Sequence, residues 1–372
     1  MNIKTIESKS ALNKSGIGGV DYVINPYVGC AHACVYCYAD FMRRFTGHEG
    51  EVWGTFVDVK TNIVERLKRE IFGRIDRSRE TRLRQPGLPG SLPGLSSFPP
   101  GPPSSAHPAV PHSAVPRPAT HRARYTGEIM FSSVTDPYQP LEAEWRLTRG
   151  CLESLLAVES MELAAESGEV EIGTGAKPGP RPGAAGPESS PRRARRAISI
   201  LTKSDLVTRD IDILKDFQDC TVGLTITTAR DEVARIFEPG APSPSRRLAA
   251  LEKLNEAGIK TWVFMAPVLP YFSDRPEEME LLFKAVAAAG TQEISMDPMN
   301  FYPSVKYRMS SLFDRVSQSG NRTSAGHTGG EHAGALAYLN KVMRDPEGWR
   351  IDIKAGAHKA ADKYGIHMKF AF

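Results

Sequence analysis

The sequence predicts an α/β protein built on a parallel β-sheet. Outside two proline-rich segments, short apolar runs alternate with stretches of helical periodicity, which is the pattern of repeated βα units. At 372 residues and 41% hydrophobic content, the chain is long enough for one large α/β barrel or for two domains. Six βα units account for the pattern, so we favour a single sheet.

The expected strands are short and apolar, and most are followed by a helical pattern. They span residues 21–25, 128–133, 197–201, 220–227, 259–267 and 293–297. The expected helices span residues 61–71, 141–164, 210–216, 245–257 and 276–289, with two more at 335–344 and 351–364. In the first helix, Ile63, Leu67 and Ile71 recur every four residues and therefore share one face.

Two segments carry the net positive charge of the chain and most of its prolines. Residues 74–124 contain eight arginines against two acidic residues, and residues 164–197 contain six basic and four acidic residues, so the rest of the chain is acidic although the net charge is +4. Such compositions bury too little apolar surface to offset the entropy of ordering. We expect disordered insertions at 78–124 and 164–197. The arginine run at 192–196 is either a solvated loop end or a contact for an acidic partner.

The insertions divide the expected barrel into pieces. Residues 1–77 start it and carry a cysteine-rich loop, residues 125–163 and 198–302 complete it, and residues 303–372 form a flexible loop, at 320–334, and a helical part. No uninterrupted apolar run reaches membrane-spanning length, and the first residues lack the apolar segment of a signal peptide. An odd number of cysteines, five, fits a reducing compartment. We expect a cytoplasmic protein without a membrane partner.

Three of the five cysteines, Cys30, Cys34 and Cys37, lie within eight residues with the spacing C-x3-C-x2-C. A loop of this length can place three thiolates on one face of an iron–sulfur cube and leave the fourth iron open. A zinc site needs a fourth ligand, for which His32 is the candidate, but binding would strain so short a loop. The cluster is favoured and the zinc alternative stays open. The other two cysteines, at 151 and 220, are expected to be buried apolar residues.

Polar side chains follow four of the expected strands. They occupy residues 132–139, 202–205, 225–228 and 266–267. In a parallel barrel the C-terminal strand ends meet at one face, where chemistry gathers. Asp136 and Asp205 each fit a helix cap when taken alone, but four clusters on successive strands favour a shared site. Of Arg246 and Arg247, one is a candidate substrate contact, although solvent-facing arginines after an N-cap at Ser245 are favoured.

The cysteine motif, with an aromatic Tyr36 before its last cysteine, resembles the signature of the radical S-adenosylmethionine superfamily. Within it the chain is similar to the spore photoproduct lyase-like, or DNA repair photolyase-like, group. The similarity continues through Asn25-Pro-Tyr-Val-Gly-Cys30, Thr135-Asp136-Pro-Tyr, Leu201-Thr-Lys203-Ser, Ile226-Thr-Thr, Glu238-Pro-Gly-Ala-Pro-Ser-Pro and Ala266-Pro-Val-Leu-Pro. The resemblance implies a partial (β/α)6 barrel and a 4Fe–4S cluster on Cys30, Cys34 and Cys37. It also implies S-adenosylmethionine at the open iron and a reductant of the flavodoxin or ferredoxin type.

The resemblance also implies residue roles. Tyr36, Thr135, Lys203 and Thr225 fall where the lyases bind S-adenosylmethionine, with Lys203 meeting its carboxylate. Tyr38 matches a tyrosine implicated in hydrogen transfer. Reductive cleavage would give a 5′-deoxyadenosyl radical that abstracts hydrogen from a substrate, for which a DNA photoproduct-like lesion is one candidate among nucleic acids, peptides and small molecules.

One departure from the lyases concerns hydrogen return. Ser133 stands where they have a cysteine that returns a hydrogen atom to the product radical. An O–H bond is much stronger than an S–H bond, so serine is a poor donor and direct lyase activity is in doubt. The alternative function is a non-catalytic metal or iron–sulfur protein. The polar strand ends and Lys203 favour the enzyme, because a structural site needs no polar pocket facing its metal.

Overall fold

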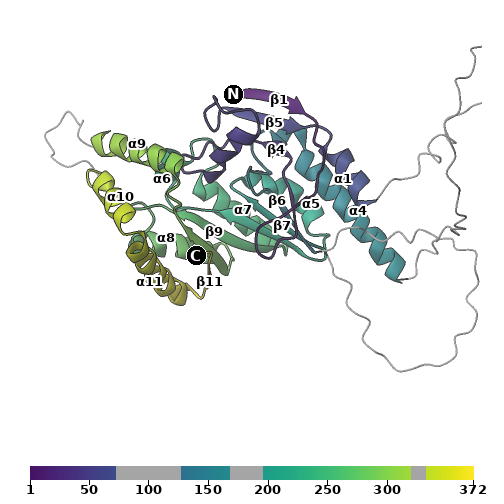
Figure 1. Ribbon diagram of the computed structural model, residues 1–372. Helices are drawn as coiled ribbons and strands as arrows, with labels where there is room; N and C mark the ends of the chain where they lie inside the picture. Colours follow the sequence, from purple (N-terminus) through teal and green to yellow (C-terminus); the bar gives the residue numbers. More distant parts are fainter. Residues whose placement is uncertain (73–126, 168–195, 320–331) are drawn as a thin grey trace, which may run out of the picture.

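A computed structural model of the chain describes residues 1–72, 127–167, 196–319 and 332–372 (Figure 1). The expected disordered insertions, 78–124 and nearly all of 164–197, lie outside the described residues, as does most of the expected loop at 320–334. Both boundaries of the second insertion were wrong: residues 164–167 end a helix that starts at Leu147, and Arg196 and Ala197 begin a strand of the main sheet.

Eight strands form the main sheet, in the order β11-β10-β9-β8-β7-β6-β3-β2. They are β2 Asn13–Lys14, β3 Tyr22–Ile24, β6 Gly127–Phe131, β7 Arg196–Thr202, β8 Cys220–Thr225, β9 Lys260–Val268, β10 Glu293–Pro298 and β11 His367–Phe370. All neighbouring pairs are parallel except β2 with β3. Strands β3 and β6 to β10 are the six expected ones in the expected order. The prediction of an α/β fold with a partial (β/α)6 barrel is confirmed.

Helices pack against this sheet and against one another. In chain order, with η marking 3-10 helices, they are η1 Tyr38–Phe45, α1 Ile63–Ile71, α3 Glu142–Trp145, α4 Leu147–Ser167, η3 Asp205–Asp210, α5 Ile211–Leu214, α6 Asp231–Phe237, α7 Pro244–Glu256, α8 Pro276–Ala288, α9 Pro303–Ser319, α10 Ala335–Arg344 and α11 Pro346–Tyr364. The expected helix at 141–164 is broken at Arg146, whose φ is 51°. Helices α1 and α4 lie side by side (Figure 1). None of the described helices is both long and apolar enough to cross a membrane.

A second, three-stranded sheet was not expected. It consists of β1 Asn2–Ile6, β5 Phe56–Lys60 and β4 Tyr27–Val28, with β5 in the centre. Phe56 packs with Cys30, Ala39 and Trp53 in a small core of its own. A Cβ at Gly29, whose φ is +79°, would lie 2.5 Å from the Phe56 carbonyl oxygen. This sheet therefore fixes the start of the cysteine loop.

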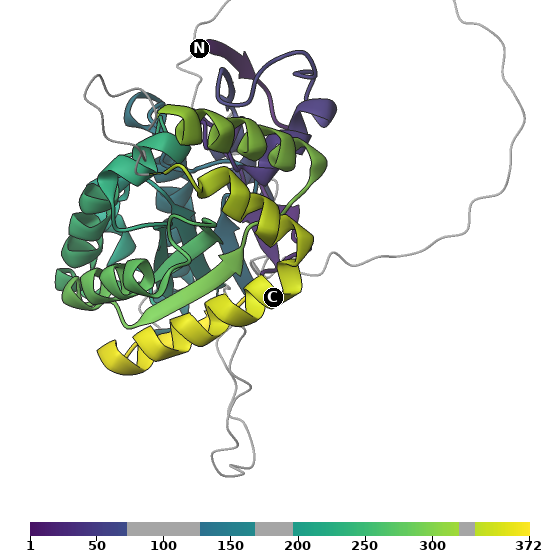
Figure 2. The same cartoon turned by 90° about the vertical axis from the view of Figure 1, so that its left-hand side faces the viewer.

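The C-terminal part of the chain is helical, as expected, and contains more than expected. Helix α10 has the predicted bounds, α11 starts five residues earlier than predicted, and α9 and β11 were missed. Helices α9, α10 and α11 run along one side of the molecule (Figure 2), where α10 packs on α9 and α11 on α8. Strand β11 adds to the sheet beside β10.

Candidate functional site

The loop between β4 and η1 carries three thiols that lie near one another. Cys30 and Cys34 are buried and Cys37 is half-buried. The turn is tight: the Cys37 N–H donates to the Cys34 carbonyl at 3.1 Å, and Ala33 has a φ of 53°. Burial, and then the charges of Asp136 and of the other two thiols, hold the pKa of Cys30 well above its usual range. A nearby positive charge or a bound metal must lower this raised pKa before the thiols ionise.

Three thiols from one loop suit an iron–sulfur cluster that keeps one iron for an outside ligand. Among the described residues, no three His, Cys, Asp or Glu side chains, these thiols included, are already arranged around a point where a metal ion could sit. His32, the fourth ligand of the zinc alternative, is buried with its Nδ1 3.3 Å from Asp136 Oδ2. Three thiols suit a cluster with one open iron, whereas a zinc ion would need His32, which lies against Asp136, as its fourth ligand.

Lys203, at the end of β7, supplies a positive charge facing these thiols. Its Nζ lies 5.6 Å from the centroid of the Tyr36 ring. Burial alone would lower the pKa of Lys203, but the charges of Cys34 and Glu238 raise it above its usual value, so the ammonium is kept charged. Burial raises the pKa of Cys34 to about 12, and Lys203 is the largest opposing influence. A cation is thus held against the cysteine loop.

Asp136 links the ends of strands β6 and β7 through hydrogen bonds. It is buried, and it accepts hydrogen bonds from Thr202 Oγ1 at 2.6 Å, the Lys203 N–H at 2.8 Å and the Tyr138 N–H at 2.9 Å. Burial opposes its ionisation, but His32 and these donors lower the pKa of Asp136 to about 2. Asp136 is not a helix cap, because α3 begins six residues later. It is a fixed anion that positions the backbone of Lys203.

A buried ion pair between Glu238 and Arg247 lies beside Tyr36, and sequence reasoning missed it. Neither charged side chain is exposed to solvent. Glu238 also accepts a hydrogen bond from the Tyr36 hydroxyl and one from Thr227 Oγ1 at 3.0 Å. Burial opposes ionisation of Glu238, but Arg247 and Lys203 lower its pKa. Tyr36, its pKa raised well above the usual range by burial and by Glu238, stays a donor.

Arg247 corrects one expectation. The prediction of solvent-facing arginines holds for Arg246, which is 63% exposed and paired with Asp205, and is wrong for Arg247. Arg247 donates to the Pro242 and Thr225 carbonyl oxygens at 2.8 and 2.9 Å in addition to Glu238. The expected N-cap was also wrong, because Ser243 and not Ser245 precedes α7.

The segment between α6 and α7 reaches the cysteine loop through its backbone as well. The Val35 N–H donates to the Phe237 carbonyl at 2.9 Å, and the Gly240 N–H donates to the His32 carbonyl at 3.0 Å. A Cβ at Gly240 would lie 2.1 Å from the Ala31 carbonyl oxygen, so this approach requires glycine. The acidic and glycine residues of Glu238-Pro-Gly240 were the signal in the sequence for this contact.

Three more predicted residues meet at the end of β6. The Tyr38 hydroxyl donates to the Ser133 carbonyl at 2.5 Å, and Thr135 Oγ1 donates to the Gly29 carbonyl at 2.5 Å. Partial burial and the charge of Cys37 raise the pKa of Tyr38 to about 12. Asn25 Oδ1 accepts from the Ser133 N–H at 3.0 Å and so orients this strand end.

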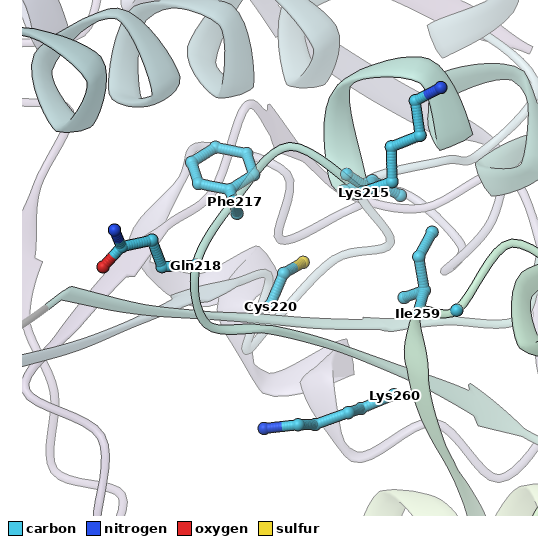
Figure 3. Close-up of a pocket in the computed structure, with 8 residues that line it drawn as sticks. Lys215, Phe217, Gln218, Cys220, Ile259 and Lys260 are labelled. Carbon is cyan, nitrogen blue, oxygen red and sulfur yellow. The ribbon is translucent and has the colours of Figure 1, made fainter. Parts of the chain in front are cut away.

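The remaining predicted residues are placed as follows. Thr225 is buried at the end of β8 and is tied to the site through Arg247. Cys151 and Cys220 are buried in α4 and β8, as predicted. Figure 3 shows a small hollow that Cys220 and Lys260 line at the first residues of β8 and β9, at the opposite end of the strands from Lys203 and Thr225. None of the predicted site residues lines it.

Comparisons with known proteins concern the family and the fold. Residues 119–283 match the family model described as Radical SAM superfamily, a range that begins after the cysteine loop. The predicted resemblance to that superfamily is confirmed over these residues. That family implies a 4Fe–4S cluster and S-adenosylmethionine.

Particular relatives are distant. The uncharacterized protein MJ0683 of Methanocaldococcus jannaschii is 28% identical over 274 residues, which are 74% of this chain and 70% of that protein. The uncharacterized protein Rv2578c of Mycobacterium tuberculosis is 26% identical over 295 residues, 77% of this chain and 62% of that protein. A solved structure of spore photoproduct lyase complexed with dinucleoside spore photoproduct has a TM-score of 0.52 at 12% identity, covering 99% of this chain and 82% of that one. At that identity the likeness concerns the fold.

Proposed function

We propose that the protein is a radical S-adenosylmethionine enzyme whose 4Fe–4S cluster is held by Cys30, Cys34 and Cys37. The observation that carries this proposal is the grouping of three neighbouring thiols on one loop, with the ammonium group of Lys203 close to Cys34 and Cys37. A bound and reduced cluster would supply the one electron needed to cleave S-adenosylmethionine into methionine and a 5′-deoxyadenosyl radical.

The chain's own residues bind and orient the cofactor. Lys203 meets the carboxylate of S-adenosylmethionine as a point charge, and the backbone contact of Asp136 keeps it at the strand end. Tyr36 presents its ring beside Lys203 while Glu238 holds its hydroxyl. Thr135 and Thr225 complete the cofactor contacts at the ends of β6 and β8.

The reaction on the substrate is hydrogen abstraction. We assign hydrogen transfer between the cofactor and a substrate to Tyr38, whose half-exposed hydroxyl donates to the Ser133 carbonyl. The lyase-like fold supports a photoproduct-like lesion in DNA as one substrate. Ser133, however, offers no thiol, so we do not expect efficient repair of spore photoproduct. The electron comes from a flavodoxin or ferredoxin.

The test is anaerobic reconstitution followed by product analysis. Wild type should bind about four irons and four sulfides, and with dithionite and S-adenosylmethionine it should release 5′-deoxyadenosine and methionine. Single Ala variants of Cys30, Cys34 and Cys37 should lose the cluster, whereas Cys151→Ala and Cys220→Ala are matched controls that should keep it. Full loading of a variant lacking all three loop cysteines would overturn the assignment. A loaded cluster that yields no 5′-deoxyadenosine would favour a structural metal protein instead.

A further inference from the structure

Arg308 is far from the cysteine loop in sequence and contacts it directly in the fold. It lies in the first part of α9 and is half-buried. Its Nε donates to the Val35 carbonyl at 2.8 Å, and its Nη2 donates to the Cys37 carbonyl at 2.8 Å. These two carbonyl groups flank the last turn of the cysteine motif. The guanidinium group therefore bridges the backbone on either side of Tyr36.

The third guanidinium nitrogen is also engaged. Arg308 Nη1 lies 2.7 Å from Asp40 Oδ2, on η1 just after the loop, and Asp40 is buried. Arg43 Nε holds the other oxygen of the same carboxylate at 2.5 Å. All three nitrogens of Arg308 thus bind the loop or its continuation. A lysine carries a similar charge but only one nitrogen, so it cannot form this planar fork.

The contact of Arg308 with the Cys37 carbonyl would affect the stability and the reduction potential of a bound cluster. Cys37 is the most exposed of the three cysteines, so packing restrains its part of the loop least. On the other side of the same loop, the Val35 N–H is held by the Phe237 carbonyl at 2.9 Å. Hydrogen bonds and net charge around an iron–sulfur cluster tune its reduction potential. A fixed cation beside a ligand favours the reduced, more negative cluster.

We propose that Arg308 is a positioning residue of the cluster site, which clamps the carbonyl groups of Val35 and Cys37 and raises the reduction potential of the bound cluster through its charge. This inference rests on the proposed function, because it requires that the three cysteines hold a cluster. It concerns a residue of α9, outside the motifs that carry the family resemblance.

The experiment compares four anaerobically reconstituted proteins: wild type, Arg308→Gln, Arg308→Lys and Arg43→Gln. Arg43→Gln is the control, because it removes the other arginine that binds Asp40 and leaves the hydrogen bonds of Arg308 to the loop carbonyl groups in place. Midpoint potentials come from redox titration followed by electron paramagnetic resonance. The retention of the cluster is measured as the rate of iron release to a chelator. Thermal unfolding of each apoprotein checks that it is folded.

The two variants of Arg308 separate charge from geometry. Arg308→Gln should have a more negative midpoint potential than wild type. It should also release iron at least about ten times faster, because the loss of one charge-assisted contact corresponds to about a tenfold change. Arg308→Lys should keep the wild-type potential and still release iron faster. Arg43→Gln should match wild type in both measurements.

The outcomes distinguish this inference from the proposed function. Loaded Arg308 variants with wild-type potential and wild-type iron release would overturn the inference and leave the cluster assignment standing. If Arg308→Gln is folded but binds no cluster, that result would support the proposed role of Arg308. The Arg308→Lys variant would then be decisive, because iron release from it at the wild-type rate would overturn the inference. Wild type that binds no cluster would overturn the proposed function itself.

Discussion

Removing the guanidinium of Arg247 should destabilise the protein far more than removing that of its neighbour. In Arg247→Met the Glu238 carboxylate would stay buried without its ion-pair partner, and the Pro242 and Thr225 carbonyl groups would each lose a donor. Breaking a buried pair from one side costs about 3–5 kcal/mol. Tyr36 and Thr227 still donate to the carboxylate. We therefore expect the free energy of unfolding to fall by about 3 kcal/mol, the lower end of that range.

The assay is urea unfolding of the apoprotein followed by circular dichroism. Arg246→Met is the matched control, one residue earlier on the same helix. Its side chain is 63% exposed and, among the described residues, is paired with the half-buried Asp205 alone, so the loss should stay below about 1 kcal/mol. Pairing Arg247→Met with Glu238→Gln removes the uncompensated charge. The double variant should lose less stability than the two single losses added together.

Two results would refute this reasoning. If Arg247→Met and Arg246→Met lost the same stability, the pair would not be the buried contact described. If the double variant lost the full sum, Glu238 and Arg247 would act independently. Either result would also remove the support that Glu238 gives to Tyr36.

Three other variants test separate parts of the molecule. Lys203→Ala should weaken binding of S-adenosylmethionine by about 1.5–3 kcal/mol with the iron content unchanged, measured by calorimetry on loaded protein; unchanged affinity would contradict the carboxylate contact. Ser133→Cys should increase any trace repair of a dinucleotide spore photoproduct, measured by chromatography, and rapid repair by wild type would contradict the need for a thiol. His48 lies between Asp58 and Glu51 at 2.9 and 2.7 Å. Burial lowers its pKa, but these carboxylates raise it above the usual value. His48→Gln should therefore lose most stability below about pH 6.5, with the difference from wild type shrinking as pH rises through the folded-state pKa; a difference independent of pH between 5.5 and 9 would contradict a charged His48.

The strands of the barrel were predictable because each carries its own apolar run. Strand β1 was not, since four of its five residues are exposed and its pairing with β5 defines it. Helix α9 was missed although Val305, Met309 and Phe313 recur every four residues and are buried. That pattern was present in the sequence and had the ordinary helical spacing.

The site was predictable to the extent that its residues form a local motif. Cys30, Cys34 and Cys37 are recognisable from spacing alone. Arg247 is not, because an arginine in the first turn of a helix is usually solvated, and only the folded position of Glu238 shows that this one is buried. Arg308 lies 271 residues from the carbonyl that it binds, and no local pattern marks such a contact.

Three parts of the chain that are distant in sequence contact the cysteine loop and fix its conformation. After β6, Gln139 Oε1 accepts from the Ala31 N–H at 2.9 Å. From the α6–α7 segment come the contacts of Gly240 and Phe237, and from α9 comes Arg308. Three thiols on a short peptide could bind iron in many arrangements, and these long-range contacts fix the backbone of the loop that carries them. Because positioning supplies much of the rate in catalysis, we expect the proposed activity to require the folded barrel and not the motif by itself.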